Sequence, residues 1–141
     1  MLDIISHIFS SAHIIGVSSN LLLAICSYES NLKNVIVTEA NGSKSYGICM
    51  VKLSTAKQFD KTIKAKQLMD PKVNSLMAAK YLNYQLKRYN GNWCRAVASY
   101  NAGSFLESEW KGIPRNIKYV NRVRSRLHIE EQKKLKCRGG H

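Results

Sequence analysis

An apolar run that ends at a carboxylate decides the fold of this chain: Leu-Leu-Leu-Ala-Ile-Cys-Ser-Tyr-Glu-Ser-Asn-Leu, residues 21–32. A helix of this sequence is apolar around much of its circumference, so we expect it at the centre of the core. Ser18 or Ser19 can cap its first turn, and we expect it to end near Tyr28. Glu29 therefore lies at the end of a buried helix.

Helical periodicity continues on both sides of this run. The apolar spacing and the capping residues predict further helices from Leu2 to Ile15, over 54–59, from Pro71 until Asn90-Gly91, from Asn92 until Gly103, and from Pro114 through Val123. Residues 31–46 combine a β-branched run with the turn formers Asn41-Gly42-Ser43 and form the one strand-like segment, a short hairpin or ordered loop.

The expected fold class is mainly α, as one helical domain with a short β-hairpin or loop. We predict that the domain covers residues 1–126. Residues 127–141 belong to a basic C-terminal tail that is dense in Lys and Arg and ends in Gly-Gly-His, and we expect this tail to fray.

The chain is strongly basic: 22 Lys and Arg against nine Asp and Glu give a net charge of +13. This charge favours polyanionic partners, namely nucleic acid, anionic membrane or bacterial cell wall. A basic nucleic-acid-binding module is thus one candidate function. No zinc-finger or RNP pattern supports it, so we expect no specific nucleic acid and interpret the tail as attracting anionic cell-wall polymers or membrane.

No stretch approaches the roughly 20 apolar residues that a membrane-spanning helix needs, so we expect a soluble protein. The N-terminus lacks a basic region and a small-residue cleavage site, which argues against a signal peptide. Export would then use another route.

Four cysteines, Cys26, Cys49, Cys94 and Cys137, are widely separated. They form no C-x-x-C pair and have no His at metal-ligand spacing, so we expect no metal site. Buried or free thiols are the preferred interpretation, and a disulfide such as Cys26 to Cys94 is the alternative.

Glu29 differs from the other carboxylates, most of which lie in polar surroundings. Burial against Cys26, Tyr28 and the preceding apolar run would raise the pKa of its carboxyl toward the range useful to a general acid. By spacing alone, however, a helix-end acid paired with a basic residue is the commoner case. Whether Glu29 is catalytic is therefore judged from the sequence segments that follow it.

Four short segments resemble motifs of the soluble lytic transglycosylases, a family of the lysozyme-like superfamily. They are Leu22-Leu23-Ala24-Ile25 followed by Tyr28-Glu29-Ser30-Asn31-Leu32, the run Ser45-Tyr46-Gly47-Ile48-Cys49-Met50-Val51 with Thr55-Ala56, Ser99-Tyr100-Asn101-Ala102-Gly103, and Tyr119-Val120. The segments follow the family's order, each at an expected helix end or loop, and the resemblance covers about residues 11–124.

The resemblance implies a lysozyme-like domain whose hairpin or loop lies beside a cleft for the glycan strand of peptidoglycan, with Glu29 as catalytic acid and no cofactor. Such enzymes cleave the β-1,4 bond between N-acetylmuramic acid and N-acetylglucosamine. Glu29 would protonate the glycosidic oxygen and then take the proton of the muramyl C6 hydroxyl, leaving a 1,6-anhydro end. We expect a monomer that acts in the periplasm or cell wall and is delivered by phage lysis machinery, a virion or a secretion apparatus.

The resemblance also implies contacts with the sugars. Asn101 would hydrogen-bond an acetamido or sugar group, and Tyr119 would lie close to Glu29, although both also have structural interpretations. The other expected substrate-binding residues are Thr38, Ser45, Tyr46, Met50 and Tyr100. Thr38 is also a candidate to orient Glu29, and a core role is the alternative for Tyr100.

Two positions leave alternatives open. Met50 stands where the family usually has Gln, and because Met cannot donate an amide hydrogen bond, we expect an altered substrate preference. Glu39 is expected to be an exposed turn residue, because it lies beside Asn41-Gly42. If it instead lay about 6.5–9.5 Å from Glu29, inverting hydrolysis like that of goose-type lysozymes would be the expected reaction.

Overall fold

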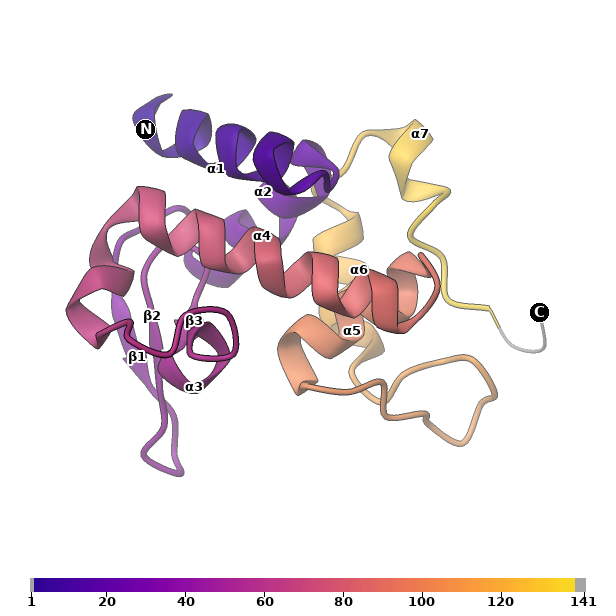
Figure 1. Cartoon of the computed structure of the whole chain (residues 1–141). Coiled ribbons are helices and arrows are strands. Elements are labelled where there is room, and N and C mark those ends of the chain that lie inside the picture. Colours follow the sequence, from indigo (N-terminus) through magenta and orange to yellow (C-terminus); the bar gives the residue numbers. More distant parts are fainter. Residues whose placement is uncertain (1, 139–141) are drawn as a thin grey trace. The chain divides into compact units, whose positions relative to one another are not determined.

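The computed structural model describes residues 2–138 of the chain. It divides into two compact units, Met1–Tyr81 and Leu82–His141. The division falls within helix α4, Pro71–Arg88 (Figure 1). The domain boundary expected at residue 126 stays a prediction.

Two helices open the first unit, and both were predicted. They are α1, Leu2–Ile15, and α2, Ser19–Ser30, which pack together (Figure 1). The hydroxyl oxygen of Ser18 caps α2 by accepting a hydrogen bond from the Leu21 N–H at 3.1 Å. The helix ends where Asn31 adopts a left-handed conformation with φ of 56°. It is therefore longer than predicted and includes Glu29 in its last turn.

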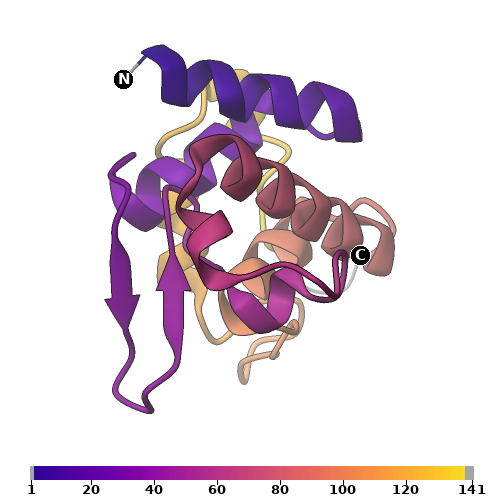
Figure 2. The same cartoon turned by 60° about the vertical axis from the view of Figure 1, so that its left-hand side comes forward.

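A three-stranded antiparallel sheet in the order β1-β2-β3 follows α2. The predicted hairpin is confirmed as β1, Ile36–Thr38, and β2, Lys44–Tyr46, with Val37 opposite Ser45. Its tip points away from α1 (Figure 2). The expectation of one strand-like segment was wrong, because Val51–Lys52 forms β3 beside β2. Only partner strands reveal a strand this short.

Short helical segments complete the first unit before α4. They are α3, Leu53–Ala56, and the 3-10 helix η1, Ala65–Met69. The helix predicted over 54–59 was too long, since turns replace it after Ala56: the N–H of Gln58 donates to the Thr55 carbonyl. Helix α4 starts at Pro71, as predicted.

In the second unit, α5 spans Trp93–Ala102. Its ends confirm the prediction: the Asn92 side chain accepts a hydrogen bond from the Arg95 N–H at 3.0 Å, and Gly103 ends the helix with φ of 86°. It packs against α6, Ile117–Arg124. Pro114 does not open that helix, contrary to prediction, because it pairs with Glu107 in an isolated β-bridge.

The basic C-terminal segment is packed rather than frayed over its described part. Helix α7 of this unit spans Ile129–Gln132, and Leu135 is buried. Burial of this leucine and the covalent bond formed by Cys137 outweigh the composition that predicted fraying. Residues 139–141 of the predicted tail lie outside the described residues.

Both disulfides contradict the expectation of free thiols. Cys26 is bonded to Cys49 in the first unit, and Cys94 is bonded to Cys137 in the second. The alternative pair, Cys26 with Cys94, was also wrong. The four residues lie 23 and 43 positions apart within their pairs, and such separations carry no sequence signal for pairing.

We expect the Cys94→Ser/Cys137→Ser variant to lose about 2–4 kcal/mol of unfolding free energy, because cross-linking the ends of this long segment restricts the unfolded chain. Urea denaturation of the oxidised proteins measures the difference. Dithiothreitol should lower the stability of the Cys26→Ser/Cys49→Ser variant further and leave the four-serine variant unaffected. Equal stability of the Cys94→Ser/Cys137→Ser variant and the parent would contradict the prediction.

Candidate active site

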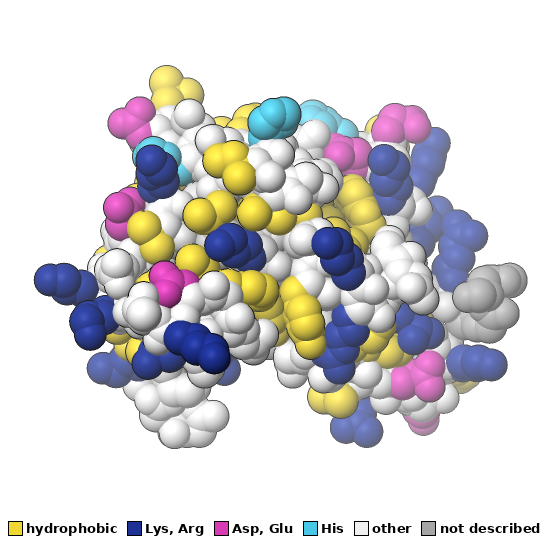
Figure 3. All heavy atoms as spheres, viewed as in Figure 1, with side chains coloured by type: hydrophobic (Ala, Val, Ile, Leu, Met, Phe, Trp, Pro, Cys, Tyr) yellow, Lys and Arg dark blue, Asp and Glu magenta, His cyan; other side chains and the backbone are white. Residues whose placement is uncertain are grey.

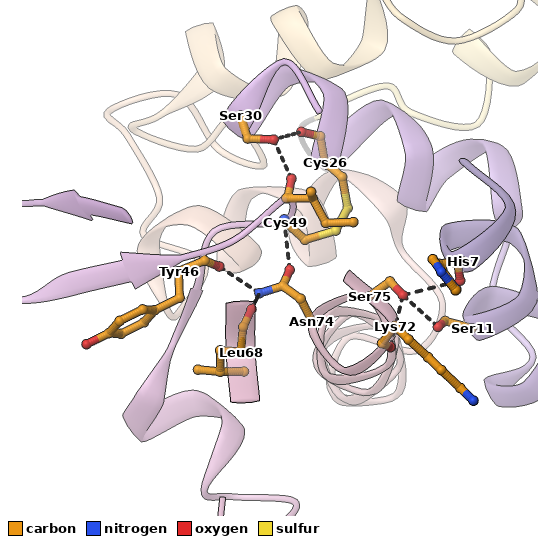
Figure 4. Close-up of a disulfide and its surroundings, with 11 residues drawn as sticks. His7, Ser11, Cys26, Ser30, Tyr46, Cys49, Leu68, Lys72, Asn74 and Ser75 are labelled. Carbon is orange, nitrogen blue, oxygen red and sulfur yellow. Dashed lines mark hydrogen bonds between the residues drawn. A yellow bond between two sulfur atoms is a disulfide. The ribbon is translucent and has the colours of Figure 1, made fainter. Parts of the chain in front are cut away.

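Glu29 lies in the last turn of α2 and is half-buried. Two bonds fasten this helix end to the segment after β2 (Figure 4). The first is the Cys26–Cys49 disulfide. The second runs from the Ser30 hydroxyl to the Ile48 carbonyl at 2.5 Å; that hydroxyl also lies 3.2 Å from the Cys26 carbonyl. The candidate acid thus has one anchor three residues before it and another directly after it.

The segment that receives these bonds is a tight turn after β2. Gly47 has φ of 76°, Met50 has φ of 51°, and the Met50 N–H donates to the Gly47 carbonyl at 3.1 Å. A left-handed conformation is uncommon for a residue other than glycine. The surrounding structure must therefore hold Met50 in place.

Asn74 of α4 holds the turn through its side-chain amide, which is completely buried. Its Oδ1 accepts from the Cys49 N–H at 2.9 Å, and its Nδ2 donates to the carbonyls of Tyr46 at 2.7 Å and Leu68 at 2.8 Å (Figure 4). The amide satisfies three backbone groups that would otherwise need other partners in the interior.

Asn74 was not among the residues predicted for the site. Its only local signal is a polar pair, Asn74-Ser75, inside an otherwise apolar helical pattern. Ser75 is also buried, and its hydroxyl shares a 2.9 Å hydrogen bond with that of Ser11. A buried polar pair in a helix was thus a signal that the side chains bind other segments.

The predicted residues of the first unit differ in their surroundings. Ser45 is buried in β2. Tyr46 lies directly before the Asn74-bound turn, Gly47–Met50, and Met50 is its last residue; both are half-buried. Thr38 is exposed at the end of β1, opposite Lys44. Glu39 is exposed in the hairpin turn, where its N–H donates to the Ser43 carbonyl at 2.7 Å.

The other predicted residues belong to the second unit, around the end of α5. Tyr100 and Tyr119 are buried, whereas Asn101 is exposed. The side-chain NH₂ of Asn116 donates to Oδ1 of Asn101 at 3.0 Å and to the Ala98 carbonyl at 3.0 Å. These bonds orient the Asn101 amide so that its own NH₂ group is presented from an exposed side chain. The predicted proximity of Tyr119 to Glu29 joins residues of different units and stays a prediction.

Two residues of α4 that the sequence analysis missed hold the end of α5. Buried Gln85 donates through Nε2 to the Gly103 carbonyl at 3.3 Å, and Nη1 of Arg88 donates to the same carbonyl at 3.0 Å. Nη2 of Arg88 also donates to the Ser104 hydroxyl at 2.9 Å. These hydrogen bonds thus fix the position of Gly103 and Ser104, where the segment after Asn101 begins.

Lys and Arg side chains are spread over the face drawn in Figure 3, while carboxylates are few. Residues 2–138 contain no group of three or more His, Cys, Asp and Glu that could hold a metal ion. None of the helices described there is long and apolar enough to cross a membrane.

Comparison with known proteins identifies one family. Residues 6–122 match the model described as "Transglycosylase SLT domain". One similar solved structure is that of an inactive mutant of lytic transglycosylase Slt from Pseudomonas aeruginosa: it is 20% identical with a TM-score of 0.63, and the match covers 94% of this chain and 22% of that one. The 70 kDa soluble lytic transglycosylase from Escherichia coli is 21% identical with a TM-score of 0.55, over 84% of this chain and 18% of that chain.

A complex of the 70-kDa soluble lytic transglycosylase with bulgecin A is also similar, at 19% identity and a TM-score of 0.54, covering 86% of this chain and 20% of that one. The chain thus spans about a fifth of the length of these proteins. The likeness confirms the predicted fold class, mainly α and lysozyme-like.

Proposed function

Because the chain belongs to the transglycosylase SLT domain family, we propose that it is a peptidoglycan lytic transglycosylase with Glu29 as its catalytic acid and base. One observation carries the assignment of the residue. The half-buried Glu29 lies at a helix end fastened to the family-like turn at Gly47–Met50 by a disulfide and by the Ser30 hydroxyl. These two anchors fix the backbone that carries the Glu29 side chain before substrate binds.

The reaction needs two proton transfers. Glu29 in its acid form gives its proton to the oxygen of the β-1,4 bond, and the bond from that oxygen to C1 of N-acetylmuramic acid breaks. The carboxylate then takes the proton of the C6 hydroxyl, whose oxygen bonds to C1. The products are a 1,6-anhydro end and a free 4-hydroxyl on N-acetylglucosamine, and Glu29 regains its proton. Water is not consumed.

The exposure of Glu39 favours this reaction over hydrolysis. An inverting glycosidase needs a second carboxylate that activates a water molecule across the sugar ring. Glu39 is the nearest candidate in sequence, and it lies in an exposed hairpin turn whose backbone is hydrogen-bonded to Ser43. Goose-type hydrolysis therefore remains the second candidate reaction.

The residues that the resemblance marks as substrate-binding would contact the glycan. Asn101, oriented by Asn116, offers an amide NH₂ group to an acetamido or sugar oxygen. Met50 offers no such donor where the family usually has Gln, which supports an altered preference at that sugar. Roles for Thr38, Ser45 and Tyr46 rest on the resemblance alone, as do those of Tyr100 and Tyr119.

We place this activity in the periplasm or cell wall. Two disulfides favour an oxidising compartment. The net charge of +13 favours contact with anionic wall polymers or membrane. We propose that the protein acts as a monomer. Phage lysis machinery, a virion or a secretion apparatus would deliver the protein.

Mass spectrometry of digested peptidoglycan tests the proposed reaction. We expect fragments that end in 1,6-anhydromuramic acid, each lighter than the corresponding reducing end by one water molecule. Digestion in water enriched in oxygen-18 is the control, because a transglycosylase introduces no label. Labelled reducing ends would identify a hydrolase instead. Binding of DNA without any wall digestion would favour the nucleic-acid module.

A further inference from the structure

The loop between α5 and α6, residues 103–116, is ordered by its own hydrogen bonds. Its two sides meet at the Glu107–Pro114 bridge, where the Arg115 N–H donates to the Leu106 carbonyl at 2.8 Å. Its tip is closed by the Ile113 N–H, which donates to the Trp110 carbonyl at 3.0 Å. Glu107 also accepts, through Oε2, from the Gly112 N–H at 2.8 Å.

Both ends of this loop are fixed beside the candidate sugar-binding residue Asn101. Gln85 and Arg88 hold its start at Gly103, and the Tyr89 hydroxyl accepts from the Phe105 N–H at 2.8 Å. Its last residue, Asn116, donates to Oδ1 of Asn101. Figure 1 shows the loop as an arm that leaves α5 and returns to α6. Its position is thus coupled to that of Asn101.

This ordered arm presents apolar side chains to solvent. Trp110 is 68% exposed and Leu106 is 47% exposed. Burying a large apolar side chain stabilises a fold, so an exposed indole on a well-ordered loop gives up stabilisation that a packed position would provide. Apolar side chains exposed on one ordered loop offer a surface on which a ligand can dock.

We propose that Trp110 forms an additional sugar subsite, where its indole stacks on the apolar face of a pyranose ring in the glycan strand. This rests on the proposed function, since it assumes that Asn101 binds the same strand. A sugar ring presents C–H groups on one face, which suit the flat π surface of an indole. The arm would therefore add a contact to the glycan strand that Asn101 binds.

The charges around Trp110 favour a glycan over an anionic surface. Glu109 and Lys111 flank the indole, and both are exposed. Within residues 103–116, Glu107 and Glu109 balance Lys111 and Arg115, so the arm is neutral although the whole chain carries +13. A loop that docks on anionic lipid is instead expected to be basic, because each Lys or Arg near such a surface strengthens the electrostatic attraction.

Tryptophan fluorescence can follow the subsite directly. The chain has two tryptophans, so Trp93→Phe leaves Trp110 as the one indole. In a Glu29→Gln/Trp93→Phe protein, which is designed not to cleave its ligand, we expect soluble peptide-free glycan strands to quench and blue-shift the emission saturably. Fragments of two sugars should need a higher concentration for the same change, because they offer fewer rings to bind and stack.

Affinity provides the second measurement. In the Glu29→Gln background, Trp110→Ala should weaken binding of long glycan strands about tenfold by calorimetry, and Trp110→Phe should restore most of it. Ile129→Ala is the matched control, since Ile129 is also in the second unit and 74% exposed, and it should bind like the parent. Circular dichroism should show the same fold in all variants.

Several outcomes would overturn the proposal. They are unchanged emission at saturating glycan, equal affinity of Trp110→Ala and its parent, a Trp110-dependent association of the chain with itself, or Trp110-dependent binding to anionic phospholipid vesicles in place of glycan. Lysis by the Glu29→Gln protein would instead refute the assignment of Glu29 as the catalytic acid in the proposed function. The two failures are distinguishable, because stacking is measured without cleavage.

Discussion

The Glu29→Gln variant is expected to lose wall-lytic activity by a factor of at least about 10²–10⁴, the contribution typical of a positioned general acid or base. Glutamine keeps the size of the side chain but has no carboxyl proton to give to the leaving oxygen. It also cannot take the proton of the C6 hydroxyl, so both steps fail. Clearing of a suspension of purified sacculi, followed by absorbance, measures the rate.

Glu39→Gln is the matched control for this experiment. It removes the same charge from the exposed hairpin turn of the same unit, and we expect a rate within about twofold of the parent, since isolated surface charges contribute little. A large loss with Glu39→Gln would revive the two-carboxylate hydrolase. Persistent lysis by Glu29→Gln would show that another group is the acid.

Local chemistry explains what the sequence predicted well. Ser18 and Asn92 cap α2 and α5 through their own side chains, and Gly103 ends α5 in a conformation that suits glycine. These bonds join residues within about one helical turn. The positions of Glu29 and Asn101 at helix ends, on which the proposed site depends, follow from the same local signals.

Long-range partners explain what the sequence could not predict. The pairing of Cys26 with Cys49 depends on where the turn after β2 meets α2. Pro114 has the composition of a helix start, yet Glu107 pairs with it across the loop and α6 begins only at Ile117. In each case, a contact between distant residues outweighs a local preference.

The buried polar residues of helix α4 also depend on long-range partners that the sequence does not predict. Asn74 and Gln85 are polar residues of one amphipathic helix, yet both are buried. Asn74 binds the backbone of Cys49, and Gln85 binds the backbone of Gly103. Such residues resemble exposed positions in the sequence, because their value lies in partners that only the fold supplies. Their hydrogen bonds hold the backbone of two segments that resemble the family's motifs.

Gly47→Ala is expected to lower the unfolding free energy by about 3 kcal/mol or more, through strain and overpacking together. At φ of 76°, an added Cβ atom would collide with Nδ2 of Asn74 and would lie 2.7 Å from the Leu68 carbonyl oxygen. The backbone carbonyl cannot move aside freely. Displacing the Asn74 amide would break its bonds to Cys49 and Tyr46.

Gly42→Ala separates the clash from the backbone strain. Gly42 has φ of 87° in the hairpin turn, and a Cβ atom added there would have nothing within 4 Å, so we expect a loss of about 1 kcal/mol from the conformation alone. Urea denaturation of both variants measures the difference. Since the Asn74-bound turn also holds the end of α2, Gly47→Ala should reduce lysis even where the protein remains folded, whereas Gly42→Ala should not. Equal stability and equal lysis in the two variants would mean that the turn neither resists the extra methyl group nor positions Glu29.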